Sequence, residues 1–231
     1  MPDYGTTEVA DHVMALALSL RRGVILYHER QRQSPPGPVK DDLIRRLGVQ
    51  TFGIIGLRRI GTAVALRARA SGFRVMFFDP HLPNGAERTA TLEDLLRQTD
   101  NLSVHTPLTP EIQGMLGYAE LASLRKGAVV VNTAREPIID LDALLTLLRN
   151  GHIAAAGLDG LLVEPPAEPI PELLRAYRAR EAWLDGRLVV TPHAAWFTPE
   201  SEHDTRVKSA ETMRAALLTN RPQNVITPDM H

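Results

Sequence analysis

An arginine, a glutamate and a histidine each follow a short apolar run in the second half of this chain. They are Arg135, Glu164 and His193. An arginine can hold a carboxylate in a bidentate fork and polarise the adjacent carbonyl group. A histidine can give or take a hydroxyl proton near neutral pH, and a neighbouring glutamate favours its protonated form. These three residue types suit hydride transfer to or from a small-molecule substrate, a 2-oxo or 2-hydroxy acid.

A glycine-rich segment precedes them and has the spacing of a dinucleotide-binding turn. Residues 56–61 read Gly-Leu-Arg-Arg-Ile-Gly between a predicted strand and a predicted helix, and Asp79 follows Gly61 by eighteen residues. Such a turn places a helix N-terminus at the pyrophosphate, and the acid binds the ribose hydroxyls. An aspartate there favours NAD over NADP because it repels a 2′-phosphate. The cofactor-binding candidates of this region are Gly56, Arg58, Arg59, Ile60, Gly61 and Asp79.

One position of the turn departs from the glycine pattern. Arg58 stands where a middle glycine normally lets the backbone approach the pyrophosphate. Its guanidinium could compensate by pairing with a phosphate. Alternatively, its Cβ and long side chain could obstruct the cofactor. The sequence leaves both interpretations open.

Short apolar runs alternate with helical patterns along the chain, and this alternation predicts the fold that positions these residues. Strands are expected near 52–55, 73–78, 102–104, 128–131, 153–156 and 188–190, with helices at 59–71, 92–98, 119–124 and 141–150. Buried strands between helices indicate an α/β fold, a Rossmann-type doubly wound parallel sheet. Residues 7 to about 30 predict one long helix. We expect residues 1–40 to form a hinge helix and Pro-rich loop, 41–200 the NAD-binding domain, and 201–231 a C-terminal helix and tail.

From residues 3–12 to the final helix, the sequence resembles the D-isomer-specific 2-hydroxyacid dehydrogenases. Within that family it most resembles the C-terminal-binding-protein branch, and the closer match lies in residues 63–68, 77–80 and 193–197. The resemblance implies that Arg135, Glu164 and His193 are the catalytic residues. It places residues 105–109 beside the adenosine ribose and implies a homodimer formed through the nucleotide-binding lobe. Positions near the cofactor, by the same resemblance, are Gly56, Ile60, Gly61, Asp79, Thr106, Thr133, Asp159 and Trp196.

The sequence departs from the family pattern at three further places. Glu136 and Pro137 follow Arg135 where a glycine is usual, and a charged segment at 172–180, expected as a solvated surface helix, lengthens the span before His193. The smaller substrate lobe of the family is also expected to be largely absent, so a partner chain could complete the cleft. Arg58, Glu136 and the missing lobe support an alternative to a dehydrogenase: a remodelled or inactive Rossmann protein that has lost normal NAD binding through Arg58 and the missing lobe, and that senses nucleotides, binds partners or catalyses a non-redox reaction.

Composition excludes several other classes. Lys and Arg number 26 against 27 Asp and Glu, a net charge of −1 that argues against nucleic-acid binding. There is no cysteine, which excludes a disulfide scaffold and Cys-ligated metals and fits a cytoplasmic location. No run approaches the roughly 20 apolar residues of a membrane span. No cluster with metal-ligand spacing is expected either, since His203 and Asp204 form an isolated pair.

Overall fold

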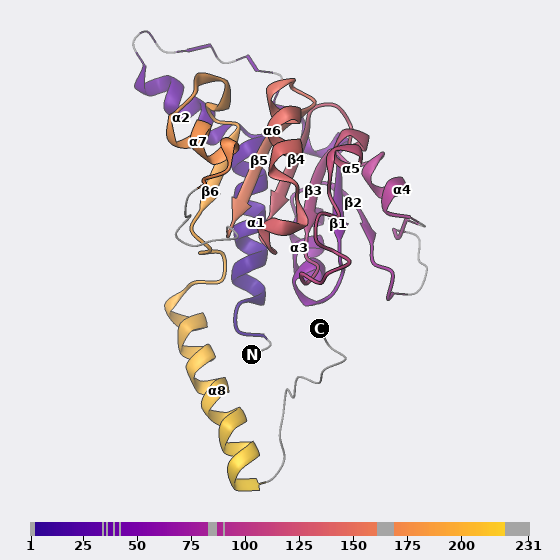
Figure 1. Ribbon diagram of the computed structural model, residues 1–231, viewed down its shortest axis with the longest axis vertical. Coiled ribbons are helices and arrows are strands. Elements are labelled where there is room, and N and C mark those ends of the chain that lie inside the picture. Colours follow the sequence, from indigo (N-terminus) through magenta and orange to yellow (C-terminus); the bar gives the residue numbers. More distant parts are fainter. Residues whose placement is uncertain are drawn as a thin grey trace.

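The structure is a computed structural model that describes residues 3–33, 35, 37–38, 40–41, 43–82, 87–89, 91–160 and 169–219. It contains a six-stranded sheet in the order β2-β1-β3-β4-β5-β6, and every strand pair is parallel (Figure 1). The predicted doubly wound α/β fold is confirmed. The strands are β1 (Thr51–Ile55), β2 (Arg74–Phe78), β3 (Asn101–Val104), β4 (Ala128–Asn132), β5 (Ile153–Asp159) and β6 (Leu188–Thr191).

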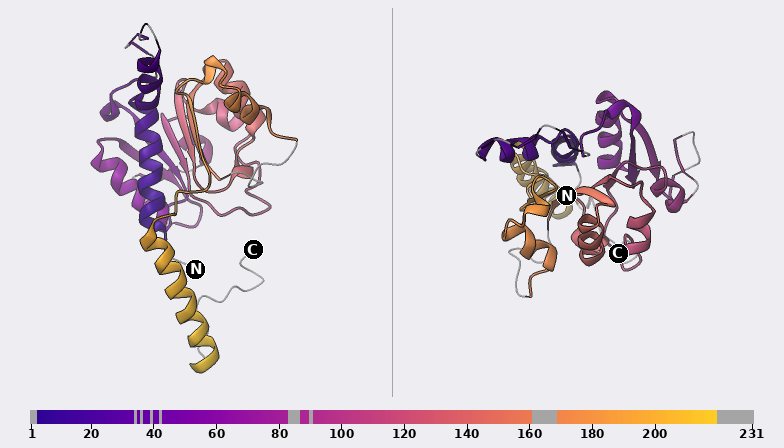
Figure 2. Two further views of the ribbon diagram at one scale, coloured as in Figure 1. Left: turned by 90° about the vertical axis from the view of Figure 1, so that its left-hand side faces the viewer. Right: turned by 90° about the horizontal axis from the view of Figure 1, so that it is seen from above.

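Helices cover both faces of the sheet (Figure 2). One face is covered by α1 (Thr6–Arg21) and α3 (Arg59–Ala70), and the other by α4 (Leu92–Leu96), α5 (Tyr118–Ser123), α6 (Leu141–Arg149) and α7 (Glu172–Arg178). Strand β4 shows why its sequence is an unbroken apolar run: Val129 and Val131 enter the first core and Val130 enters the second. A strand buried on both faces has no polar side. The 3₁₀ turns are Leu47–Val49, Glu136–Ile138 and Ala182–Leu184.

The prediction of one helix from residue 7 to about 30 was wrong. Helix α1 ends at Arg21, and a second helix, α2 (Val24–Arg32), begins after Gly23. Gly23 has a φ of 62°, in the left-handed region, and a Cβ there would lie 2.5 Å from Ile44 Cδ1. The apolar spacing continues through this break, so periodicity alone did not reveal it. The glycine was the signal that could have.

The charged segment near residue 175 is not solvated on all sides. Leu173, Leu174 and Ala176 of α7 are buried, while Arg175 and Arg178 are exposed. The prediction of a solvated surface helix was therefore wrong for the face that packs on the sheet, because its apolar residues join the core.

The two ends of the chain differ in how they join this body. Val13, Ala17 and Leu20 of α1 are fully buried, so α1 shares the core of the nucleotide-binding sheet. Helix α8 (Pro199–Thr219) instead projects away from the body (Figures 1 and 2). The domain limits at residues 40 and 200 stay a prediction. Among the residues described above, no helix is both long and apolar enough to cross a bilayer.

Candidate active site

A cleft of about 860 Å³ lies at the carboxyl ends of the strands. The strand order reverses between β1 and β3, and open α/β sheets bind ligands at such a point. Loops that follow β3, β4, β5 and β6 meet there with the start of α3. A second cavity of about 270 Å³ shares some lining residues with this cleft and is also lined by Arg58 and Arg59. The predicted residues that line the larger cleft are Ile60, Thr106, Thr133, Arg135, Asp159, His193 and Trp196.

The two glycines of the nucleotide turn are required by its shape. Gly56 has a φ of +85°, and a Cβ on it would lie 2.9 Å from the carbonyl oxygen of His105. A Cβ on Gly61 would lie 2.0 Å from the carbonyl oxygen of Gly56. These contacts bring the start of α3 against β1 and the loop after β3, so the helix N-terminus faces the cleft. The turn thus keeps the close packing that the glycine pattern predicts.

Arg58 occupies backbone that any residue can adopt, with φ −83° and ψ −154° immediately before α3. Its side chain is exposed and lines the smaller cavity. The turn is therefore not strained by the arginine, and both interpretations of its side chain remain predictions. Arg59 is also exposed and forms an ion pair with Asp3, in which the nitrogen and oxygen are 2.6 Å apart.

Asp79 stands at the end of β2, where the sequence predicts a ribose-binding acid, but it also has backbone partners. Its carboxylate accepts a hydrogen bond from the amide of Leu57 at 2.9 Å and another from the amide of His81 at 2.9 Å. Only 3% of Asp79 is exposed. The carboxylate therefore fastens the nucleotide turn to β2, and its contact with a ribose stays a prediction.

Arg135 is exposed on the turn that follows β4. The buried side chain of Asn132 holds this turn, because its amide nitrogen donates to the Arg135 carbonyl at 2.8 Å and its oxygen accepts from the Ala134 amide at 3.0 Å. One guanidinium nitrogen of Arg135 donates to the Ala134 carbonyl at 2.6 Å. Among the described residues no other acceptor binds this guanidinium, so its remaining donors can hold a carboxylate.

His193 faces the same cleft from a strained turn after β6. Its φ is +53°, an uncommon value for a residue other than glycine, and its amide donates to the Thr191 carbonyl at 3.0 Å. Strain of this kind is often found at functional sites. Arg135 and His193 therefore line one cavity, whereas Glu164, the third predicted catalytic residue, lies outside the described residues.

Two hydroxyl groups in the cleft lack partners. Thr106 Oγ1 and Thr133 Oγ1 are buried and form no hydrogen bond within the described part of the chain. Buried polar atoms are normally satisfied, and an exception calls for a missing ligand or another explanation. These hydroxyls, together with the closely packed glycine turn, fit a large polar ligand such as a dinucleotide.

His105 lines the cleft and was given no role of its own by the sequence. Burial lowers its pKa to about 3, so its imidazole is neutral near pH 7. Its Nε2 lies 2.7 Å from the Ser103 hydroxyl. The signal that could have identified it is its place directly after β3, at the same edge of the sheet as the other candidates.

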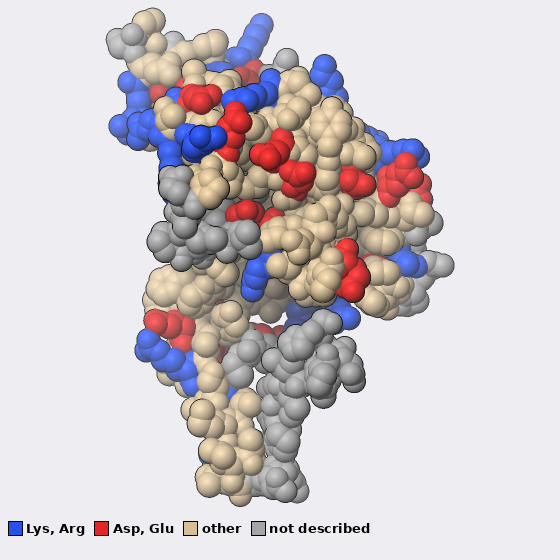
Figure 3. Space-filling view, in the orientation of Figure 1, with Lys and Arg blue, Asp and Glu red and all other residues tan. Residues whose placement is uncertain are grey.

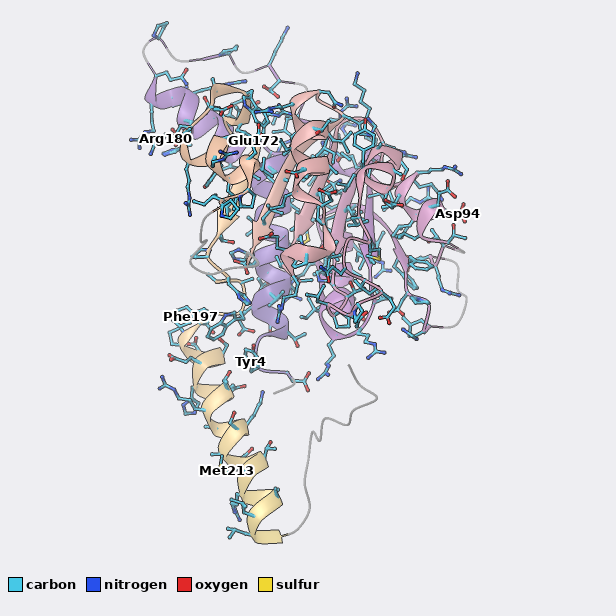
Figure 4. All side chains as sticks on the ribbon, viewed as in Figure 1. Tyr4, Asp94, Glu172, Arg180, Phe197 and Met213 are labelled. Carbon is cyan, nitrogen blue, oxygen red and sulfur yellow. The ribbon has the colours of Figure 1, made fainter. Side chains whose placement is uncertain are left out.

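Aromatic side chains form the wall of the cleft next to α8. Trp196 packs edge-to-face against Tyr4, with ring centroids 5.9 Å apart, and against Phe197 at 5.7 Å. Figure 4 places the labelled Tyr4 and Phe197 where the body meets α8. The N-terminal segment and the loop after β6 therefore meet at this wall, which gives the cleft an apolar side.

Sequence comparison supports the interpretation of this cleft. The sequence model of the D-isomer specific 2-hydroxyacid dehydrogenase NAD binding domain matches residues 14–195. The chain belongs to this family. It is 33% identical over 232 residues to a glycerate dehydrogenase from Methylorubrum extorquens, covering 97% of this chain and 69% of that protein. It is 35% identical to the D-3-phosphoglycerate dehydrogenase of Bacillus subtilis over 91% of this chain, but spans only 39% of that protein.

Solved structures agree with the family assignment. A D-lactate dehydrogenase from Lactobacillus jensenii with NAD⁺ matches with a TM-score of 0.84 and 28% identity, covering 98% of this chain and 70% of that chain. The Aquifex aeolicus D-lactate dehydrogenase with NAD and lactic acid matches with a TM-score of 0.81 and 26% identity, over 95% of this chain and 69% of that one.

These matches bear on the cofactor. The chain carries the family's NAD-binding domain, so its cofactor is NAD, as predicted. The chain spans 69% of the glycerate dehydrogenase and 69–70% of the two D-lactate dehydrogenases. A dehydrogenase is favoured over a remodelled Rossmann protein. Among the described residues, no group of three or more His, Asp and Glu side chains could hold a metal.

Proposed function

We propose that this chain transfers hydride between NAD(H) and a small 2-oxo or 2-hydroxy acid. The observation that carries the proposal is that Arg135 and His193 line one cleft together with the two unpartnered hydroxyls of Thr106 and Thr133. A carboxylate clamp, a proton donor and polar groups for the cofactor are the parts that this reaction needs.

Each side chain has a distinct part in the proposed reaction. NADH, when bound, would supply the hydride that the carbonyl carbon of a 2-oxo acid gains. His193 gives the carbonyl oxygen its proton, so that the product is a 2-hydroxy acid; in the reverse direction His193 takes that proton. Arg135 binds the substrate carboxylate and polarises the carbonyl group. We assign Glu164 to hold the protonated form of His193, as the family resemblance implies.

The cofactor is held by other residues. We propose that Arg59 and the amides at the start of α3 meet the pyrophosphate, since a helix N-terminus attracts anions. Asp79 is proposed to meet the ribose, and Asp159, Ile60 and Trp196 the nicotinamide side of the cleft. The hydroxyls of Thr106 and Thr133 are proposed to bond the cofactor, because that gives both buried oxygens a partner.

The experiment that tests the function begins with binding. NADH and NADPH are titrated into the chain by calorimetry, and NADH oxidation is then followed with glyoxylate, pyruvate and hydroxypyruvate. We expect NADH to bind more tightly than NADPH and at least one 2-oxo acid to be reduced. NADH binding without turnover of any of these acids would contradict the proposed reaction, and Arg135→Met separates substrate binding from cofactor binding.

The same titration distinguishes the two interpretations of Arg58. If its guanidinium pairs with a phosphate, Arg58→Gly weakens NADH binding, and the loss shrinks as salt is raised. If the side chain obstructs the cofactor, Arg58→Gly strengthens binding. We propose the first, because the arginine is exposed, unstrained and beside the helix N-terminus. Arg74→Gln, at an exposed arginine on the start of β2, is the control for a general loss of charge.

We propose that a second copy of this chain covers part of the exposed apolar surface. Met213, Leu217 and Leu218 of α8 are exposed by 62%, 75% and 76%. Figure 3 shows uncharged surface along the lower part of α8, below a body whose charges of both signs are scattered. Contiguous apolar surface of this kind often marks an interface. Light scattering is expected to give a homodimer, and a monomer at all concentrations would contradict this.

The cytoplasmic location and the C-terminal-binding-protein branch stay predictions.

A further inference from the structure

We propose that His12 and Thr191 are positioning residues that fix the His193 loop through the buried carboxylate of Asp159. His12 comes from α1, Thr191 ends β6 and Asp159 ends β5, so the chain of contacts joins three elements far apart in sequence. The inference rests on the proposed role of His193 in proton transfer. The residues of this network do not react themselves. They fix the position of His193 through Asp159, which lines the cleft.

Asp159 is the centre of the network. Its side chain is 0% exposed, and its two oxygens accept three hydrogen bonds. Oδ1 accepts from the Thr191 hydroxyl at 2.6 Å and from the Ala194 amide at 2.8 Å, and Oδ2 accepts from the Ala195 amide at 2.9 Å. A buried carboxylate is tolerated only when donors surround it. Two of these donors are the amides that directly follow His193.

The direction of each hydrogen bond follows from which of the atoms can carry a proton. A carboxylate only accepts, and the single hydroxyl proton of Thr191 points to Asp159 Oδ1 at 2.6 Å, which is much nearer than the Leu158 carbonyl at 3.4 Å. The Thr191 oxygen must then accept from its other neighbour, His12 Nε2, which lies 3.1 Å away. His12 therefore carries its proton on Nε2. A chain of donors runs from His12 through Thr191 to Asp159, and such chains strengthen their members.

This network explains how a strained turn is maintained. The amide of His193 is satisfied by the Thr191 carbonyl, and the two following amides by Asp159, so the backbone from 193 to 195 is tied to the ends of β5 and β6. A non-glycine residue at φ +53° persists only where its surroundings impose that conformation. Loss of the Thr191 hydroxyl removes one hydrogen bond from Asp159 and, among the described residues, the hydrogen bond of His12 Nε2. The loop should then relax and the His193 ring should move.

The test compares Thr191→Val, which has the same shape without the hydroxyl, with Thr191→Ser, which keeps it. We expect Thr191→Val to lower kcat for 2-oxo acids about tenfold while the KM for NADH stays within about twofold, since misplacing a catalytic group acts on the chemical step. Hydrogen exchange at the amides of Ala194 and Ala195 should rise about tenfold. The imidazole resonances of His193 should shift. In Thr191→Ser, the kcat, the amide exchange and the His193 resonances should all stay close to those of the native chain.

Thr146→Val is the matched control, because the Thr146 hydroxyl donates to the Asp142 carbonyl, at 2.9 Å, on the exposed side of α6. Unchanged amide exchange and unchanged His193 resonances in Thr191→Val would overturn the proposal, whatever the activity. Raised exchange with an unchanged kcat would also overturn it. If the native chain reduces none of the acids, the proposed function fails, while amide exchange and the His193 resonances still decide whether the network positions the loop. Should Thr191→Val not fold, His12→Leu against His12→Gln makes the same comparison from α1.

Discussion

The two ends of the sheet differ in how some of their buried polar groups are satisfied. At the amino ends of the strands, Arg21 is 1% exposed, yet its nitrogens donate to Asn101 Oδ1 at 2.8 Å, to the Asp100 carbonyl at 2.5 Å and to the Leu43 carbonyl at 3.4 Å. Arg187 likewise donates to four carbonyl groups, among them those of Ala154 and Trp183. These two arginines find their hydrogen-bond acceptors within the chain itself.

At the carboxyl ends, groups are left for something else to satisfy. Thr106 Oγ1 and Thr133 Oγ1 have no partner in the described part of the chain, and His193 lies in a strained turn. One further buried atom without a partner in the described chain, His152 Nε2, belongs to the turn before β5, so the amino end has an exception of its own. One end therefore contributes stability, whereas the other gives up some stability to bind a ligand.

The largest expected effect is at the carboxyl end. His193→Ala should lower the rate of 2-oxo acid reduction by about 10² to 10⁴-fold, because it removes the proposed proton donor. The free energy of unfolding should change by less than about 1 kcal/mol, since the site does not support the core. Steady-state kinetics and urea unfolding measure the two effects, with His203→Ala on exposed α8 as the control. A variant that keeps its activity would remove His193 from the mechanism.

The opposite result is expected at the amino end. Arg21→Met should lower the free energy of unfolding by about 3–5 kcal/mol, because Asn101 Oδ1 and the Asp100 carbonyl lose a buried charged donor. NADH affinity of the folded fraction should stay the same. Arg22→Met, at the exposed neighbour, is the control. A loss in Arg21→Met below about 1 kcal/mol would mean that this network contributes little net stability. Burial lowers the pKa of Arg21 to about 10, which is still high enough for it to be charged at pH 7.

The same contrast explains what the sequence could predict. All six strands and the parallel order were accessible because strands buried on both faces are continuous apolar runs. That topology indicates that ligands bind at the carboxyl edge of the sheet, and the sequence predicted Thr133, Arg135, Asp159 and His193 as site residues because each lies at or just after the end of a strand.

Long-range contacts could not be predicted in this way. Gly23 is a local signal of the break between α1 and α2, but its close approach to Ile44 is a tertiary contact, and the partners of Asp159 come from β6 and the loop beyond it. His12 carries no local signal, because its partner Thr191 is 179 positions away. Residue type and spacing therefore predicted residues that line one cleft, while tertiary contacts decided how each side chain is held.

A pH-dependent effect should separate the two ends further. Burial holds the pKa of His105 near 3, against 6.5 for an ordinary histidine. Between these values the unfolded chain binds one proton more than the folded chain, so stability is complete above pH 6.5 and falls as the pH is lowered. The slope is about 1.4 kcal/mol per pH unit, or about 2 kcal/mol lost between pH 7 and 5. His105→Gln should remove that loss in urea unfolding at the two pH values, and an identical loss in the variant would contradict the assignment.

The smallest expected effect tests the unpartnered hydroxyls directly. Thr133→Val removes a buried oxygen that nothing in the described chain satisfies, so the ligand-free protein should become more stable by up to about 1 kcal/mol. NADH affinity should fall about tenfold, because the bound cofactor loses a hydrogen-bond partner. Thr146→Val, whose hydroxyl is satisfied within α6, should change neither quantity appreciably. Calorimetric titration and thermal unfolding decide the outcome. If Thr133→Val weakens the fold and leaves NADH binding intact, the hydroxyl supports the chain rather than the ligand, and the contrast between the two ends of the sheet fails at this residue.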